Sequence, residues 1–241
     1  MDQTLPATPD LSAQVAELAR RYKRANGPVI RLVNRLGSSL EGQLSALPDS
    51  VRTQIERVTA QALETSYGLA ARTPDLGTRG PMAAVIAAGA AGGAGGLPTA
   101  VAELPVTVTL FLNAIRAEAR DAGLDPTEDW VRAECLQVFS AGSPLSQDDG
   151  VNTSFVASRL ALTGSAVQNL ISAIAPKLAA VLGQKLAAQA VPVLGAVSGA
   201  ALNAAYLSYY REIARVRFAL LKLGQVHGTE AVEAEFRLAT T

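Results

Sequence analysis

The pattern of hydrophobic and polar positions predicts a chain built from helices. Apolar side chains recur at intervals of three and four residues through most of the sequence, whereas the period-two alternation of half-buried strands is almost absent. Thr107–Val108–Thr109 has local strand propensity, but it lies within a helical pattern. We therefore expect an all-α fold, a multi-helix bundle with a central apolar core rich in Ala and Gly.

Capping residues, prolines and glycines divide this pattern into segments. Residues 1–9 predict a loose N-terminal tail, and residues 10–241 predict a single all-α domain. Within it we expect N-terminal helices over 10–72, a turn-rich linker at 73–80 and a helical core over 81–238. The expected helices are 10–25, 28–36, 48–71, 83–94, 99–122 (bent near Pro105), 126–142, 153–175, 176–189, 192–223 and 229–238, with Gly224 and Gly228 flanking the last turn.

Two long stretches, Pro81–Ala102 and Leu186–Tyr210, contain no charged residue. Segments of this kind are hidden from water, either in a protein core or in lipid. The first would be roughly 33 Å long as a continuous helix, just enough to cross a bilayer. Its glycines and Pro98 make it a poor continuous helix, however. We expect both stretches to fold against each other as helices inside the bundle. The alternative is that these stretches contact a membrane.

Three tyrosines, Tyr206, Tyr209 and Tyr210, cluster near the end of the second stretch, which is flanked by Lys185 and Arg211. One interpretation is a central bundle helix whose tyrosines reach the rim. The other is a helix that dips into the membrane interface, where aromatic side chains are enriched.

The charge balance narrows the classes of function. Lys and Arg total 21, as do Asp and Glu. This balance gives no electrostatic footprint for nucleic acid, so no nucleic-acid partner is expected. Cys135 is the only cysteine, which excludes an intrachain disulfide and fits a reducing compartment. The first residues lack the basic and apolar regions of a signal peptide. We therefore expect a cytoplasmic protein, with a position peripheral to the inner membrane as a further option.

Glu103 is the most interesting carboxylate, because it ends the first uncharged stretch two residues before Pro105. A buried glutamate with polar neighbours can serve as an acid–base catalyst or bind a ligand. It can equally pair with an arginine such as Arg116 or Arg159 as a structural anchor. The candidate ligand-pocket residues are Glu103, Thr107, Asn113, Gln189 and Asn203, with Glu103 the candidate catalytic residue.

Other candidate chemistry is weaker. Arg211, Arg215 and Lys222 share one helical face, where they either complement a helix dipole or bind anionic headgroups at a membrane surface. His227 is the sole histidine and is expected in a solvated turn, so no imidazole metal site is predicted. Cys135 lies on an apolar helical face, as an inert thiol would. The glycines at 89–96 lack the Gly-Lys-Ser/Thr of a phosphate-binding loop, and no cofactor is expected.

Several local strings carry a family resemblance. They are Ala-Glu-Leu-Pro-Val-Thr-Val-Thr at 102–109, Glu-Cys-Leu-Gln-Val-Phe at 134–139, Ala-Gln-Ala-Val-Pro-Val-Leu-Gly-Ala at 188–196 and the tail from Tyr210 to Gly228. In order and spacing they resemble the EcsC protein family. One departure is Arg217-Phe218, where tails of that family carry a His-Phe pair, so a family-wide histidine role would not apply here.

The resemblance implies no established biochemical activity. The family's namesake is encoded beside an ABC exporter in Gram-positive bacteria, and members are described as hydrophobic, with membrane association suggested for them. We therefore expect an accessory protein that is not an enzyme and that acts at membranes on the cytoplasmic side, with lipid or an ABC transporter as its partner. The alternative is a soluble enzyme whose buried carboxylate acts on a hydrophobic substrate.

Overall fold

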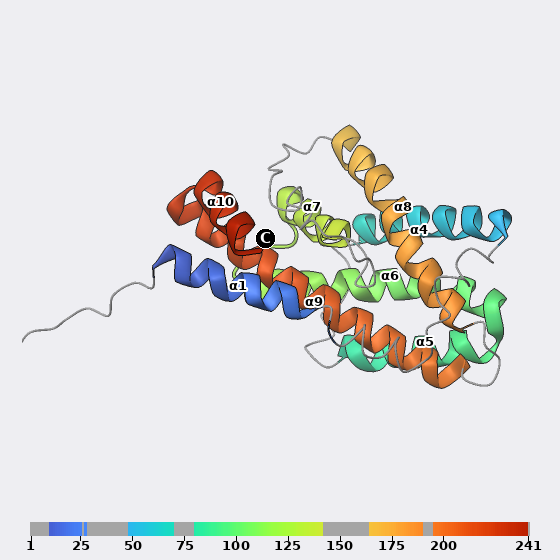
Figure 1. Ribbon diagram of the computed structural model, residues 1–241. Coiled ribbons are helices and arrows are strands. Elements are labelled where there is room, and N and C mark those ends of the chain that lie inside the picture. The colour runs from blue at the N-terminus through green and yellow to red at the C-terminus, as the bar shows by residue number, and fades with distance from the viewer. Residues whose placement is uncertain are drawn as a thin grey trace, which may run out of the picture.

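The computed structural model describes residues 10–25, 27, 48–69, 80–141, 164–189 and 195–240. Every regular element within these ranges is a helix, which confirms the all-α multi-helix arrangement. Figure 1 shows how these helices pack. They are α1 (Leu11–Ala25), α4 (Asp49–Leu69), α5 (Gly80–Ala94), α6 (Gly96–Asp121), α7 (Asp129–Gln137) with the 3-10 turn η1 (Val138–Ala141), α8 (Gly164–Gln189), α9 (Gly195–His227) and α10 (Thr229–Thr240).

Helix α6 forms the centre of the bundle. It lies between α4 and α5 in Figure 1 and also contacts α7, α8 and α9. Its side chains Leu104, Val108, Phe111 and Ile115 are completely buried. They follow one another at spacings of three and four residues, which places them along one side of the helix. The main hydrophobic core is built on this side of α6.

The two uncharged stretches pack against each other, as the sequence predicts, through α5 and α9. The contact is close because glycines face each other across it. A Cβ atom built on Gly89 would lie 2.3 Å from the carbonyl oxygen of Gly199. The first stretch is not one continuous helix, because a turn at Gly95 separates α5 from α6.

The expectation that the tyrosines reach the rim of the bundle, or a membrane interface, is wrong. Tyr206, Tyr209 and Tyr210 are each no more than 3% exposed. The ring of Tyr210 packs between Phe111 and Phe139, with centroid distances of 5.5 and 5.0 Å. Aromatic pairs at such distances stabilise a core beyond the area that they bury. These tyrosines therefore lie in the interior because α9 is covered by α6 and η1 at this point.

A smaller apolar cluster joins the two ends of the chain. Val15 and Leu18 of α1 meet Val216 and Leu220 of α9, and Phe236 of α10 completes the cluster. This cluster holds α1 and α10 beside the C-terminal half of α9, at the left of Figure 1.

Several helix boundaries differ from those predicted by a few residues, and at two places a helix continues past an expected break. The predicted break before Pro176 is absent, and α8 runs through this exposed proline. Buried Ile174 and Leu178 on either side of it pack against the core, which offsets the lost backbone hydrogen bond. The predicted end of α9 near 223 is also wrong, because α9 continues to His227. Gly228, whose φ of +88° is left-handed, ends the helix. The predicted helix at 28–36 and most of the linker at 73–80 lie outside the described residues.

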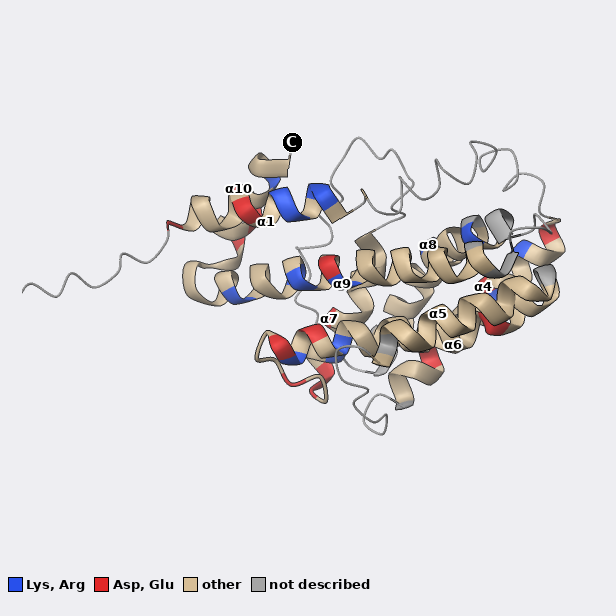
Figure 2. Ribbon diagram, turned by 90° about the horizontal axis from the view of Figure 1, so that it is seen from below, with Lys and Arg blue, Asp and Glu red and all other residues tan. Residues whose placement is uncertain are grey.

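Charged side chains are unevenly distributed over the bundle. Helix α5 has none, α6 has only Glu103 before Arg116, and α9 has none before Arg211. Figure 2 accordingly shows α5 without charge along its whole length, while the charged residues of α1, α7 and α9 gather toward the other end of the molecule.

The contact between α5 and α9 predicts a strong penalty for a methyl group at Gly89. In Gly89→Ala the new Cβ would lie 2.3 Å from the Gly199 carbonyl oxygen and 2.7 Å from the Asn203 side chain. We expect the free energy of unfolding to fall by about 1–3 kcal/mol, because the helices must separate. Gly68→Ala is the matched control, since Gly68 is helical with open space around it. That variant should gain about 0.5–1 kcal/mol. Urea denaturation measures both, and equal effects would contradict the close contact.

Candidate functional site

A buried polar cluster surrounds Glu103 on α6. The ammonium of Lys185, from α8, lies 3.0 Å from Oε2 of Glu103. The side-chain amide of Asn203, from α9, donates to Oε1 at 2.9 Å, and the hydroxyl of Thr107, one turn along α6, donates to the same oxygen. Three helices thus contribute to one carboxylate, and both of its oxygens accept hydrogen bonds.

Helix α5 closes the cluster from the remaining side. A Cβ atom on Gly92 would lie 2.7 Å from Oε2 of Glu103, so only glycine lets the backbone of α5 come this close. The amide of Asn203 also donates to the carbonyl oxygen of Val85 at 3.0 Å. The backbone of α5 therefore takes part in the cluster although α5 has no polar side chain near it.

Burial governs the electrostatics of the pair. The side chains of Lys185 and Glu103 are 1% and 8% exposed. Burial lowers the pKa of Lys185, and the nearby carboxylate of Glu103 opposes that shift. Removing one partner of such a pair strongly destabilises the folded protein, because the other charge stays buried without compensation. Oδ1 of Asn203 is buried with no hydrogen-bond partner among the described residues, so the cluster retains one open acceptor.

The structure brings together three of the five predicted pocket residues, Glu103, Thr107 and Asn203. Asn113 lies ten residues further along α6, about 15 Å away, and does not join them. The side chain of Gln189 lies outside the described residues. The cation beside Glu103 is Lys185, in place of the predicted arginines. Arg116 is thirteen residues along the same helix, and Arg159 is outside the described residues.

The sequence analysis did not predict Lys185 as the partner of Glu103. Lys185 directly precedes the second uncharged stretch, and a cation at the end of an apolar segment is common. The available signal was its surroundings. Leu178, Val181, Leu182 and Leu186 place an apolar face around it on a helix, and a lone lysine there requires a buried partner.

A second buried group joins α7 and α9. The guanidinium of Arg217 donates to the carboxylate of Glu134, with its Nε at 2.6 Å, and to Gln137 at 3.0 Å. Neighbouring Cys135 is completely buried, and burial raises the pKa of its thiol to about 12. This thiol is therefore protonated and unreactive in the folded protein.

The predicted basic face on α9 is divided by the structure. Arg211 and Arg215 each place Nε against the carboxylate of buried Glu118 on α6, at 2.6 and 2.8 Å. Lys222 lies further along α9, exposed and apart from them. His227 is exposed at the end of α9. Within the described residues no group of three or more His, Cys, Asp or Glu side chains is placed to hold a metal ion.

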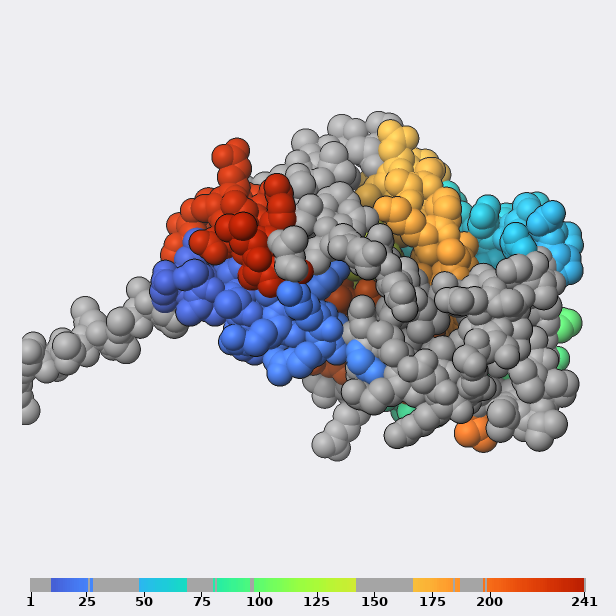
Figure 3. Space-filling view, viewed as in Figure 1, coloured from blue at the N-terminus to red at the C-terminus, as the bar shows by residue number. Residues whose placement is uncertain are grey.

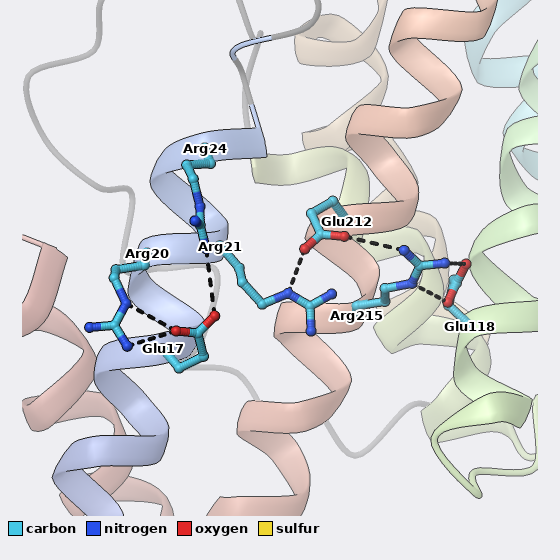
Figure 4. Close-up of polar contacts among 7 residues, drawn as sticks. All are labelled: Glu17, Arg20, Arg21, Arg24, Glu118, Glu212 and Arg215. Carbon is cyan, nitrogen blue, oxygen red and sulfur yellow. Dashed lines mark hydrogen bonds and ion pairs between the residues drawn. The ribbon is translucent and has the colours of Figure 1, made fainter.

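Arg211 and Arg215 border a cleft between α1 and α9. Figure 3 shows α9 at the floor of a recess beside α1. The cleft has a volume of about 570 Å³. Figure 4 shows a chain of ion pairs across it: Arg21 reaches Glu212 at 2.6 Å, Glu212 reaches Arg215 at 3.3 Å, and Arg215 reaches Glu118. The lining residues are Glu17, Arg21, Arg24, Ala25, Ser208, Arg211, Glu212 and Arg215.

The buried pair predicts a large effect of neutralising one partner. Lys185→Met leaves the Glu103 carboxylate buried without a cation, and we expect a loss of about 3–5 kcal/mol in the free energy of unfolding. The double variant Glu103→Gln/Lys185→Met should lose less than the two single variants together, because no lone charge remains. Arg20→Gln removes an exposed pair with Glu17 and should change stability by less than about 1 kcal/mol. Urea denaturation measures the free energy of unfolding of each variant. Equal losses in Lys185→Met and Arg20→Gln would contradict a buried ion pair between Lys185 and Glu103.

The environment of Cys135 predicts protection from alkylation. Because its pKa is raised to about 12, iodoacetamide at mildly alkaline pH should modify the native protein only as fast as it unfolds. The unfolded chain, with a thiol pKa of about 8.5, should react at once in urea. Between pH of about 8.5 and about 12 the thiol of the unfolded chain ionises, whereas that of the folded protein does not. The free energy of unfolding therefore falls as the pH rises through this range. Rapid labelling of the native protein, followed by mass spectrometry, would contradict this picture.

Comparison with known proteins places the chain in a family. Residues 34–220, more than half of the chain, match the model of the EcsC protein family. Searches of curated proteins and of solved structures return no significant match. The match includes α4 to α8 and most of α9, and so all four side chains of the Glu103 cluster. The chain belongs to the EcsC protein family.

Proposed function

We propose that this protein is a membrane-associated, lipid-binding accessory protein that acts on the cytoplasmic side, and that α5 and the first half of α6 provide its membrane-facing surface. One observation carries the proposal. Three charged residues occur between residues 80 and 119, namely Glu103, Arg116 and Glu118, and all three are buried. Forty consecutive residues thus expose no charge to solvent, although α5 and the first half of α6 present several side chains at the surface.

The exposed residues of these helices form two uncharged stripes. On α5 they follow helical spacing at Ala83, Ile86, Ala87, Ala91 and Ala94, and on α6 at Pro98, Thr99, Ala102, Pro105 and Val106. Ile86 and Val106 are 41% and 51% exposed. Surfaces that combine apolar side chains with a lack of charge are typical of contacts with membranes or with other proteins.

The packing favours surface contact over a transmembrane span. Pro98–Asp121 is the one helix of the described residues that is long and apolar enough to cross a bilayer, with a mean hydropathy of 1.4. However, 61% of its apolar window is buried inside the protein, so a crossing would require the core to unpack. Helix α5, with 15 residues, is about 22 Å long and too short to span the hydrocarbon layer.

A link to an ABC transporter is part of the proposal and rests on the family resemblance alone. The accessory role requires no catalysis, which agrees with a Glu103 cluster whose carboxylate is fully engaged by Lys185, Asn203 and Thr107.

A second candidate function is a soluble enzyme that acts on a hydrophobic substrate, with Glu103 as acid–base catalyst. The observation that favours it is the gathering of Glu103, Thr107, Lys185 and Asn203, with Oδ1 of Asn203 unpartnered among the described residues. Lipids extracted from the purified protein provide the substrates to test. If the enzyme hypothesis holds, Glu103→Gln loses turnover while keeping its helix content, and vesicle binding is unaffected.

The membrane proposal predicts that charges on the uncharged stripes weaken vesicle binding. Ala91→Glu and Val106→Glu should each weaken partitioning by about 1 kcal/mol or more, so the double variant should bind roughly thirtyfold less tightly or weaker still. Leu238→Glu is the matched control, because Leu238 is 75% exposed on α10, away from α5 and α6. The measurement is sedimentation with vesicles of phosphatidylcholine and phosphatidylglycerol. Full recovery of the unmodified protein in the supernatant would remove the proposal.

A further inference from the structure

The cleft between α1 and α9 is lined mainly by charged side chains. Four arginines and two glutamates line it, namely Arg21, Arg24, Arg211, Arg215, Glu17 and Glu212, which leaves an excess of two positive charges. Buried Glu118 beneath the lining reduces this excess to one for the network as a whole. The cleft volume of about 570 Å³ lies within the range of small-ligand pockets.

The arginines retain hydrogen-bond donors that the described contacts do not use. Arg21 engages Glu212 only through Nε, and Arg211 engages Glu118 only through Nε. No residue within the described ranges accepts a hydrogen bond from the terminal amino groups of either side chain. A guanidinium offers five N–H donors in a planar fork that fits two oxygens of a phosphate or carboxylate. Two forks from different helices thus border the same cleft with free donors.

The carboxylates hold these arginines in place and neutralise only part of their charge. Glu118, 2% exposed, fixes the Nε sides of Arg211 and Arg215 from below. Glu212 joins Arg21 to Arg215 across the cleft. Partial burial acts to raise the pKa of Glu212, but the bonds from Arg21 and Arg215 outweigh it and hold that pKa below its ordinary value. Arginine side chains that carboxylates already hold in place lose less conformational entropy on ligand binding than mobile arginine side chains would.

We propose that this cleft binds a phosphomonoester group through Arg21, Arg24, Arg211 and Arg215, with the hydroxyl of Ser208 as a further donor. A phosphomonoester carries between one and two negative charges near neutral pH, which matches the excess of the network. Its three terminal oxygens offer more acceptor sites to several guanidinium groups, and more negative charge, than the two oxygens of a carboxylate do. The group can belong to a soluble phosphate ester or to a phosphatidate headgroup. This inference does not depend on the membrane surface of α5 and α6.

Binding is tested with inorganic phosphate and glycerol 3-phosphate on the full chain, by calorimetry and thermal denaturation against sodium chloride at equal ionic strength. Both phosphates should bind more tightly than acetate and should raise the melting temperature further than acetate does. Arg21→Gln and Arg211→Gln should each weaken binding at least about tenfold, because a charge-assisted hydrogen bond to phosphate is lost. Arg24→Gln removes a side chain that is 70% exposed, so it provides a variant that keeps the fold and should also weaken binding. Arg57→Gln, an exposed position on α4, is the control with the same charge change.

Vesicles distinguish the two sources of the phosphate group. Phosphatidylcholine vesicles with phosphatidate should retain the protein, and Arg21→Gln should release it, if the ligand is a headgroup. Binding of glycerol 3-phosphate without any preference for phosphatidate vesicles supports a soluble ester. The inference is overturned if phosphate binds no better than acetate and the three cleft variants behave like Arg57→Gln on phosphatidate vesicles. The membrane proposal is separate from this result. It would still be supported if Ala91→Glu/Val106→Glu weakened vesicle binding.

Discussion

The close approach of α5 to α9 and α6 is the contact on which the rest of this structure depends. It exists only because Gly89 and Gly92 present no side chain toward Gly199 and Glu103. At this separation the carbonyl oxygen of Val85 comes within hydrogen-bond reach of Asn203, and Asn203 in turn reaches Glu103. A side chain on α5 at either position would open the layer that covers the ion pair and admit water to it. The apolar packing and the polar cluster are therefore one arrangement, since each requires the backbones to be this near.

The buried pair of Glu103 and Lys185 adds specificity to a core that small residues alone would leave ambiguous. Helices rich in Ala and Gly slide over one another with little change in contact area. An ion pair with two further hydrogen bonds has one geometry in which all its groups are satisfied, and every other register leaves a charge buried alone. The pair thus selects one relative position of α6, α8 and α9. Arg217 with Glu134 and Gln137 does the same between α7 and α9.

The distribution of exposed charge gives the molecule two different surfaces. Between residues 80 and 119 the exposed positions are uncharged, because the three charged side chains there turn inward. Beyond Arg211, α9 meets α1 in a cleft edged by arginines. An apolar surface and an arginine-lined cleft on one bundle suit the proposed protein, which contacts lipid with one part and binds a phosphate group with another. The family match shows that the chain belongs to the EcsC protein family. The separate roles of the two surfaces are our proposal for this protein.

Local signals in the sequence determined the helical class, most helix ends and the inward position of the uncharged stretches, because periodicity, capping residues and the cost of exposing or burying charge act within one segment. They also place Glu103 and Thr107 one turn apart on the same face of α6. Only the tertiary structure decided that Lys185 is the partner of Glu103, that Asn203 bridges it to α5, that the three tyrosines are internal and that Arg21 meets Glu212. The reason is physical: each of these depends on how helices rotate and cross, and that is set by the packing of side chains far apart in the chain. The run of α8 through Pro176 follows the same rule, since packing on both sides of the proline outweighs its local preference.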